Sequence, residues 1–317
     1  MSIKAISTNI GKALLINALF MFISIIISIV YGFDSAFTPL LISFLVTFIT
    51  GTFPFIFVKE RRTGSLQAGF LTIVLCWLFS FVFGMLPYVL WGGEFTLINA
   101  WFESVSGYTT TGSTILNDIE GLPKSLLFWR SSTHFIGGLG VIIFLLMIVP
   151  DRNPAKLRLM HLELSSLSKE GYRYKSSKVV AIITLVYVGL TIASTLSFWA
   201  AGMQLFDAVN HSFSIVSTGG FSTRNLSIGA FDSDLINVVT IIFMAVSAMH
   251  FGLIYSAFAT RSFKPLNNTV VRYYYGSIIV MSLVTMLSLL TQGSYDSFGK
   301  AALDSCFTVV SYMTSTG

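Results

Sequence analysis

Seven long runs of apolar residues divide the sequence, and short polar segments separate them. The runs cover residues 13–31, 37–58, 68–91, 126–150, 179–201, 235–260 and 274–290. A helix needs roughly 20 predominantly apolar residues to cross the hydrocarbon core of a bilayer, and the runs are close to that length or longer. The pattern predicts an all-α polytopic membrane protein with seven spans.

Three shorter apolar segments, 97–111, 205–218 and 298–314, lie between or after these runs and are rich in Ser, Thr and Gly. Because they are too short to cross a bilayer, they predict re-entrant elements, in which a half-length helix enters and the chain leaves by the same face. Irregular backbone at membrane depth is tolerated only where it lines a cavity or is buried in protein. The segments therefore predict a water-accessible interior.

Each short segment ends in a similar turn, at the same distance from a polar residue near its start. Thirteen positions separate that polar residue from the closing glycine in the pairs Asn99 and Gly112, Asp207 and Gly220, and Asp304 and Gly317. Asn and Asp are good helix N-caps, so each short helix is predicted to begin at this residue. Its C-terminal end, with about half a negative elementary charge, would then point toward the membrane centre.

The turns themselves are the candidate ion site. Small residues there let backbone carbonyls turn toward a dehydrated cation, and oxygen ligands suit a hard ion, whereas the sequence has no His/Cys cluster for a transition metal. The predicted ligands, with carbonyl oxygens facing a common axis, are Thr110, Thr111, Gly112, Ser113, Thr218, Gly219, Gly220, Ser315, Thr316 and Gly317.

Composition supports the membrane assignment. The 317 residues are 54% hydrophobic and only 10% charged, whereas soluble domains average about 25% charged residues. The net charge of +5 does not indicate a nucleic-acid partner, because the basic residues follow the membrane topology. With the N-terminus in the cytoplasm, 15 Lys and Arg residues fall inside and four outside, and the four are Lys124, Arg130, Arg224 and Lys300. This positive-inside bias predicts a cytoplasmic N-terminus and outward-opening short helices.

Enzyme signatures are absent from the sequence, which lacks the zinc-protease, nucleophile-elbow and phosphate-loop motifs. No enzymatic activity is therefore expected. Two other function classes stay open at this point: a secondary transporter that cycles by alternating access, and a membrane enzyme that uses Asp207 and His211. The second is disfavoured, because the other two segments do not repeat this Asp–His pair.

The turn motifs resemble a known family. FESVSGYTTTG at 102–112 and HSFSIVSTGGFST at 211–223 look like the filter segments of the Trk/Ktr/HKT superfamily of potassium transporters, and the extra N-terminal hairpin is similar to its TrkH branch. The resemblance implies channel-like potassium uptake through four repeats around one pore in the bacterial inner membrane. It also implies K⁺ as the transported ion, no organic cofactor on this chain, a homodimer and a gating partner, a cytosolic nucleotide-binding TrkA-like ring. Coupling of K⁺ to H⁺ or Na⁺ stays an alternative.

The family pattern divides the chain into an N-terminal two-span hairpin (1–63), repeat 1 (64–175), repeat 2 (176–265) and a partial repeat 3 (266–317). Repeat 4 is missing, so the expectation is that the chain alone does not close a fourfold pore.

Several residues outside the turns carry expectations of their own. Arg130 is expected to snorkel to the outer interface rather than to pair with Glu103. Glu103 and His211 share one offset from their glycines and are expected to hold the turns from behind. The glycines of 137–140 are expected to serve close helix packing. The basic loop 152–178 is expected to lie at anionic lipid or to dock the cytosolic partner.

Overall fold

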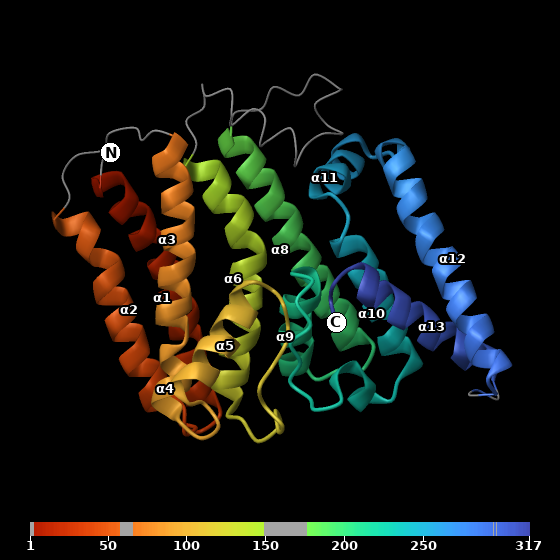
Figure 1. Ribbon diagram of the computed structural model, residues 1–317, viewed down its shortest axis with the longest axis horizontal. Helices are drawn as coiled ribbons and strands as arrows, with labels where there is room; N and C mark the ends of the chain where they lie inside the picture. The colour runs from red at the N-terminus through yellow and green to blue at the C-terminus, as the bar shows by residue number, and fades with distance from the viewer. Residues whose placement is uncertain (1–2, 58–65, 149–175, 294, 296) are drawn as a thin grey trace.

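The computed structural model describes residues 3–57, 66–148, 176–293, 295 and 297–317, and every regular element among them is a helix (Figure 1). The elements are α1 (Ile3–Val30), α2 (Phe37–Phe57), α3 (Leu66–Gly84), α4 (Leu86–Trp91), α5 (Leu97–Tyr108), α6 (Lys124–Ile148), α8 (Ser176–Ala200), α9 (Leu205–Val216), η2 (Ser227–Phe231), α10 (Asp234–Ser247), α11 (Phe251–Thr260), η3 (Lys264–Leu266), α12 (Thr269–Thr291) and α13 (Phe298–Met313). The predicted all-α fold is confirmed.

Five helical segments in the described part of the chain are long and apolar enough to cross a membrane: Ile6–Val30, Phe37–Phe57, Gly69–Trp91, Val180–Ala200 and Thr269–Thr291. Their outward-facing side chains are largely apolar, as lipid contact requires. The predicted span 126–150 corresponds to α6, whose last side chains lie outside the described residues. Of the predicted basic loop 152–178, residues 152–175 lie outside the described residues as well, and 176–178 begin α8.

The predicted span 235–260 is wrong as a single straight helix. It consists of α10 and α11, which meet at an angle of 97°. Helix α10 ends at Ser247, and a new helix starts after His250, whose ring Nδ1 accepts a hydrogen bond from the backbone N–H of Gly252 at 3.1 Å. The side chain thus satisfies one of the free N–H groups of the second helix. Apolar periodicity runs through the break, so hydropathy alone does not reveal it.

The chain runs broadly from one side of the molecule to the other, although α2 lies outside α1 and α13 turns back from α12 toward α10 (Figure 1). The α1–α2 hairpin packs on α3 and α6 through α1, α6 packs on α5, α8 and α9, and α10 packs on α13. Helix α6 is therefore the element that contacts both of the first two short helices. Figure 1 places α5, α9 and α13 in the half of the molecule away from the N-terminus.

Asp34 attaches the hairpin to the rest of the protein. It lies between α1 and α2, and its carboxylate accepts hydrogen bonds from the backbone N–H and the hydroxyl of Ser125, at 3.1 and 2.8 Å. Ser125 lies in the first turn of α6, where N–H groups lack intrahelical partners and the helix dipole favours a negative charge. One acidic side chain thus fixes the start of α6.

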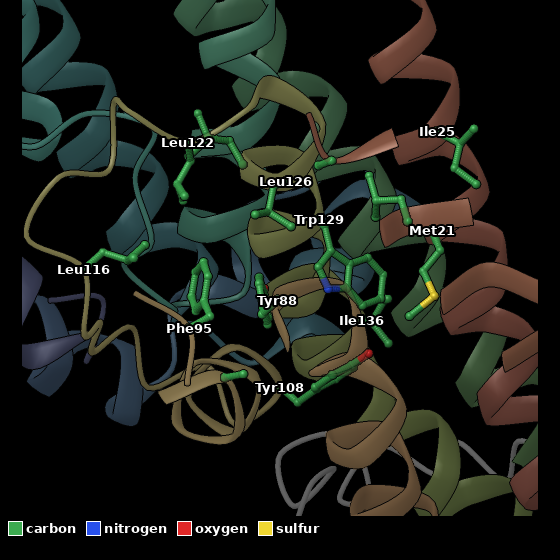
Figure 2. Packing of buried hydrophobic residues seen from close by; sticks show 14 residues of the cluster. Met21, Ile25, Tyr88, Phe95, Tyr108, Leu116, Leu122, Leu126, Trp129 and Ile136 are labelled. Atoms are coloured by element: carbon green, nitrogen blue, oxygen red, sulfur yellow. The ribbon is translucent and has the colours of Figure 1, made fainter. Parts of the chain in front are cut away.

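The main core cluster surrounds the first half of α6. Figure 2 shows Trp129 within it, together with Met21 of α1, Tyr88 of α4 and Tyr108 at the end of α5. Trp129 is fully buried, and its ring N–H donates to the carbonyl oxygen of Gly84 at 3.1 Å. This core holds α5 at a fixed height along α6, and with it the turn that follows α5.

Candidate ion-filter site

The three short helices end at the same point relative to their glycines. Helices α5, α9 and α13 stop at Tyr108, Val216 and Met313, four residues before Gly112, Gly220 and Gly317. Their starts differ: measured from the closing glycine, α13 begins one helical turn earlier than α5 and α9. The common feature is thus the C-terminal end of each helix.

The predicted N-caps are wrong. Asn99 and Asp207 are the third residues of α5 and α9, and Asp304 is the seventh residue of α13. Helix α5 is capped by Thr96, whose hydroxyl accepts from the N–H of Asn99 at 3.3 Å. Leu97 and Ile98, which follow Thr96, are already helical, so α5 begins two residues before the predicted start at Asn99.

Each helix closes with the same pair of backbone hydrogen bonds. After α5, the N–H of Thr110 donates to Gly107 O at 3.1 Å, and the N–H of Thr111 donates to Ser106 O at 2.9 Å. The pairs Thr218–Ile215 and Gly219–Ser214 repeat this pattern after α9, and Ser315–Tyr312 and Thr316–Ser311 repeat it after α13. These are the two bonds of a Schellman motif, which satisfies carbonyls at a helix end.

Two residues in every turn have positive φ. The first is not glycine: φ is 53° at Thr110, 56° at Thr218 and 54° at Ser315. The second is the closing glycine, with φ of 76° at Gly112, 91° at Gly220 and 83° at Gly317. The left-handed region is unfavourable for β-branched residues, so the threonines are genuine outliers. The three turns therefore share one strained backbone conformation.

The turns lie side by side in chain order. A Cβ atom added to Gly112 would overlap the carbonyl oxygen of Gly219, and one added to Gly220 would overlap the carbonyl oxygen of Thr316. The first turn thus contacts the second, and the second contacts the third. Helix α6 is equally close, because a Cβ at Gly137 would overlap the carbonyl oxygen of Tyr108, and one at Gly138 would come within 2.9 Å of Ser217 Cβ.

Two hollows adjoin the turns. One of ≈ 630 Å³ is lined by Thr110, Thr218, Gly137 and aromatic residues of α3. The other, of ≈ 340 Å³, is lined by Gly220, Thr316, Gly317 and residues of α9 and α13. Among the described residues no group of three or more His, Cys, Asp or Glu side chains could hold a metal ion. The predicted turn residues themselves carry only backbone carbonyls and, on Thr and Ser, hydroxyl oxygens.

Polar side chains hold the first two turns from behind, at the offset identified in the sequence. Glu103 accepts from the hydroxyl of Thr114 at 2.9 Å, and His211 Nε2 lies 2.9 Å from the hydroxyl of Ser222. Thr114 and Ser222 each stand two positions after their glycine. All four side chains except that of Thr114 are buried. The expectation that Glu103 and His211 act behind the turns agrees with these contacts.

The expectation for Arg130 is wrong. Its side chain is 1% exposed and does not reach an interface. Its Nε and Nη2 atoms both lie 2.8 Å from Glu103 Oε1. Arg130 is about two turns into α6, on the face that packs on α5, and a buried carboxylate there makes pairing more favourable than snorkelling. The sequence signal was the isolated acid Glu103 in an apolar helix.

A second polar network joins the loops that follow the first two turns. Asn225 Oδ1 accepts from the N–H of Ile119 at 2.6 Å, and its amide nitrogen donates to Asp118 at 3.0 Å. This hydrogen bond, with a second one from the N–H of Gly121, lowers the pKa of the exposed Asp118. Nearby, Arg224 pairs with the buried Asp207 at 2.7 Å.

Replacing Glu103 by Ala should strongly destabilise the protein. The change leaves Arg130 buried without its carboxylate, which in other proteins costs about 3–5 kcal/mol. The matched control is Glu120→Ala, which removes the partly exposed partner of Arg224 at 3.8 Å, where about 0–1 kcal/mol is expected. Thermal unfolding in detergent measures both, and equal shifts in Tm for the two variants would contradict the assignment.

Known proteins resemble the chain over its whole length. A family model described as TrkH, cation transport protein, matches residues 38–293. The chain is 32% identical to "Trk system potassium uptake protein TrkH" of Salmonella typhimurium, and the alignment covers all of this chain and 66% of that protein. "Trk system potassium uptake protein TrkG" of Escherichia coli is 34% identical over 78% of this chain and 52% of its own length.

A solved structure agrees with these relatives. The crystal structure of the potassium transporter TrkH from Vibrio parahaemolyticus superposes with a TM-score of 0.82 at 30% identity, and the match covers all of this chain and 65% of that one. The chain thus spans just under two thirds of the length of the TrkH proteins it matches. Because the family model matches well over half of the chain, the protein belongs to the TrkH family of cation transport proteins, a family of transporters and not of enzymes.

Proposed function

We propose that the three turns are walls of a potassium-selective filter and that the chain is part of a potassium uptake protein. The observation that carries the proposal is the set of three turns with the same backbone hydrogen bonds after a short helix, each in contact with the next through a carbonyl oxygen and a glycine. The names of the TrkH and TrkG relatives support potassium as the ion. In the resembled family a filter has four such walls, and this chain supplies three of them.

The physical basis is electrostatic. Three helix C-termini approach the turns, and each contributes about half a negative elementary charge without a buried carboxylate. Carbonyl oxygens at the turns can replace the hydration shell of a cation. We propose that the oxygens come from Thr110, Thr111, Gly112, Ser113, Thr218, Gly219, Gly220, Ser315, Thr316 and Gly317. The ion is then held by dipoles alone, which is weak enough to let it leave.

The competing functions find less support. In a membrane enzyme, Asp207 and His211 would act together, but the carboxylate binds Thr223 and Arg224 while the ring bonds the backbone of Asp207 and the hydroxyl of Ser222. A transporter coupled to H⁺ would need a titratable acid near the turns. Glu103 and Asp207, on α5 and α9, are both committed to arginines, and Asp304, on α13, accepts from the Tyr295 hydroxyl at 2.9 Å.

Serine in place of Gly112 or Gly220 should lower the preference for potassium over sodium. Each new side chain would overlap a neighbouring carbonyl oxygen and would stand at positive φ, where the backbone strain is about 1–2 kcal/mol. That strain corresponds to about a tenfold effect on binding or selectivity. Permeability ratios would be measured by flux into liposomes that contain the full gene product carrying this chain.

Gly189→Ser is the matched control for both variants. Gly189 lies in α8, its added Cβ would meet nothing within 4 Å, and it does not have positive φ. The control should keep the selectivity of the unsubstituted protein. An unchanged potassium preference in both filter variants would refute the assignment of the turns.

We also propose that the protein lies in the cell membrane, the inner membrane in a bacterium, with its N-terminus in the cytoplasm. Single cysteines in a background without Cys76 and Cys306 test this orientation. Leu226→Cys, in the exposed loop after the second turn, should react with an impermeant reagent added outside. Phe263→Cys, between α11 and α12, should react only after permeabilisation, since that junction lies on the side of the N-terminus (Figure 1). The reverse pattern would overturn the threading.

A cytosolic nucleotide-binding ring is the proposed regulatory partner, and a homodimer the proposed assembly. Basic residues between 152 and 178 would supply the docking charge. Neutralising Arg152, Lys156 and Arg158 together should weaken co-purification of the ring, and added salt should weaken it too, because exposed charges are screened over about 8 Å at physiological ionic strength. Binding that is insensitive to both changes would exclude these basic residues as the docking charge.

The proposed homodimer is a separate prediction. Light scattering of the detergent-solubilised protein would measure its mass, and a monomeric mass would contradict it.

A further inference from the structure

One side chain of α6 contacts the segments that leave the first two turns. The Nη2 atom of Arg130 donates to the hydroxyl of Thr114 at 3.2 Å, two residues beyond Gly112. Its Nη1 atom donates to the backbone carbonyl of Ser222 at 3.2 Å, two residues beyond Gly220. A single guanidinium thus bonds the equivalent position of both turns. The ion pair with Glu103 orients it from the α5 side.

The same guanidinium also stacks on the residue next to the second glycine. Arg130 Cζ lies 4.2 Å from the ring centroid of Phe221. On α6, His134 follows one helical turn later, and its ring is stacked on Phe221 with centroids 4.1 Å apart and planes inclined by 14°. His134 in turn lies 3.1 Å from the hydroxyl of Ser214, on α9. Phe221 is therefore held by two consecutive side chains of one helix face.

We propose that Arg130 is a positioning residue that sets the spacing between the first two filter turns, and that ion selectivity depends on its planar guanidinium. The inference rests on the proposed function of the turns. The geometry favours arginine specifically, because a guanidinium offers five donors in one plane together with a face that stacks on an aromatic ring. A lysine can keep the charge beside Glu103, but it cannot reach Glu103, Thr114 and Ser222 at once while stacking on Phe221.

The network is buried except at Thr114. Arg130 and Phe221 are 1% and 2% exposed, and cation–π contacts are strongest where water is excluded. Glu103 and Phe221 hold the buried guanidinium in place, so a shift of either turn would move Thr114 or Ser222 against a fixed group. Thr114 and Ser222 stand two residues after Gly112 and Gly220, and these glycines belong to turns that contact each other, so such a shift would also change the separation of the two turns.

The test is Arg130→Lys in the full gene product, with potassium and sodium flux and thermal unfolding measured on the same preparation. The expected result is a fall in the potassium-to-sodium permeability ratio by about threefold to tenfold, the effect of losing a desolvated cation–π contact. Phe221→Leu, which leaves the Glu103 ion pair intact, should lower the ratio in the same direction. The double variant should lower it by less than the product of the two single effects, because the residues act as a pair.

Arg224→Lys is the matched control, since it also shortens an arginine that pairs with a carboxylate on a short helix, and it should leave the ratio unchanged. A purely structural role for Arg130 would lower Tm without changing the ratio among folded molecules, and that outcome would overturn the inference alone. Absence of potassium-selective flux from the unsubstituted protein would overturn the proposed function and the inference together.

Discussion

A turn placed inside a membrane protein must satisfy its own backbone polar groups, because lipid offers them no hydrogen bonds. The present chain meets this constraint three times in one way. In each case, the backbone N–H groups of two turn residues donate hydrogen bonds to carbonyl oxygens in the last turn of the short helix. The polypeptide can then reverse direction with few side chains near the reversal, and the remaining carbonyls are free to face outward from the backbone. The packing of α5, α9 and α13 against their neighbours keeps these reversals at matched positions.

Helix α6 links the first two of these turns, because it packs on both α5 and α9. Asp34 fixes its first turn, Trp129 anchors it in the core, and Gly137 and Gly138 let the ends of α5 and α9 come close to its backbone. Small residues at such crossings are characteristic of membrane helices, where close van der Waals packing replaces the hydrophobic effect. The first two turns therefore share one support, and a displacement of α6 would displace both turns.

Much of the architecture could be predicted from sequence, because lipid imposes a minimum length and a simple composition on spanning helices. The short helices were recognisable too, since Ser, Thr and Gly recur at a fixed offset from each glycine. The break at His250 was not recognisable, because Ala248 and Met249 continue the apolar run and only three-dimensional packing selects the bend. The N-cap of α5 was misplaced because Thr96 competes with Asn99 for the same role. Helices α9 and α13 follow Gln204 and Ser297, whose side chains make no cap hydrogen bond, so no capping side chain marks their starts.

Long-range polar contacts were the hardest to predict. Arg130 and Glu103 are 27 residues apart, and Arg130 and Ser222 are 92 apart. Whether Arg130 snorkels or pairs depends on which face of α6 meets α5. A helix that is apolar on all sides gives no sequence signal for which face turns toward a neighbour. The equal offset of Glu103 and His211 gave a correct indication, because it derives from the repeat and not from any single contact.

The threonines at 110 and 218 have a further consequence for the history of this chain. Glycine or asparagine would adopt their left-handed backbone conformation with less strain, so threonine is not the residue that favours folding most at these positions. Residual strain of this kind tends to persist where a side chain or a carbonyl direction is needed for activity. Substitutions of Thr110 or Thr218 by glycine or asparagine, which lower the backbone strain, should therefore be found readily in screens for thermostability and be rare among variants that keep ion transport.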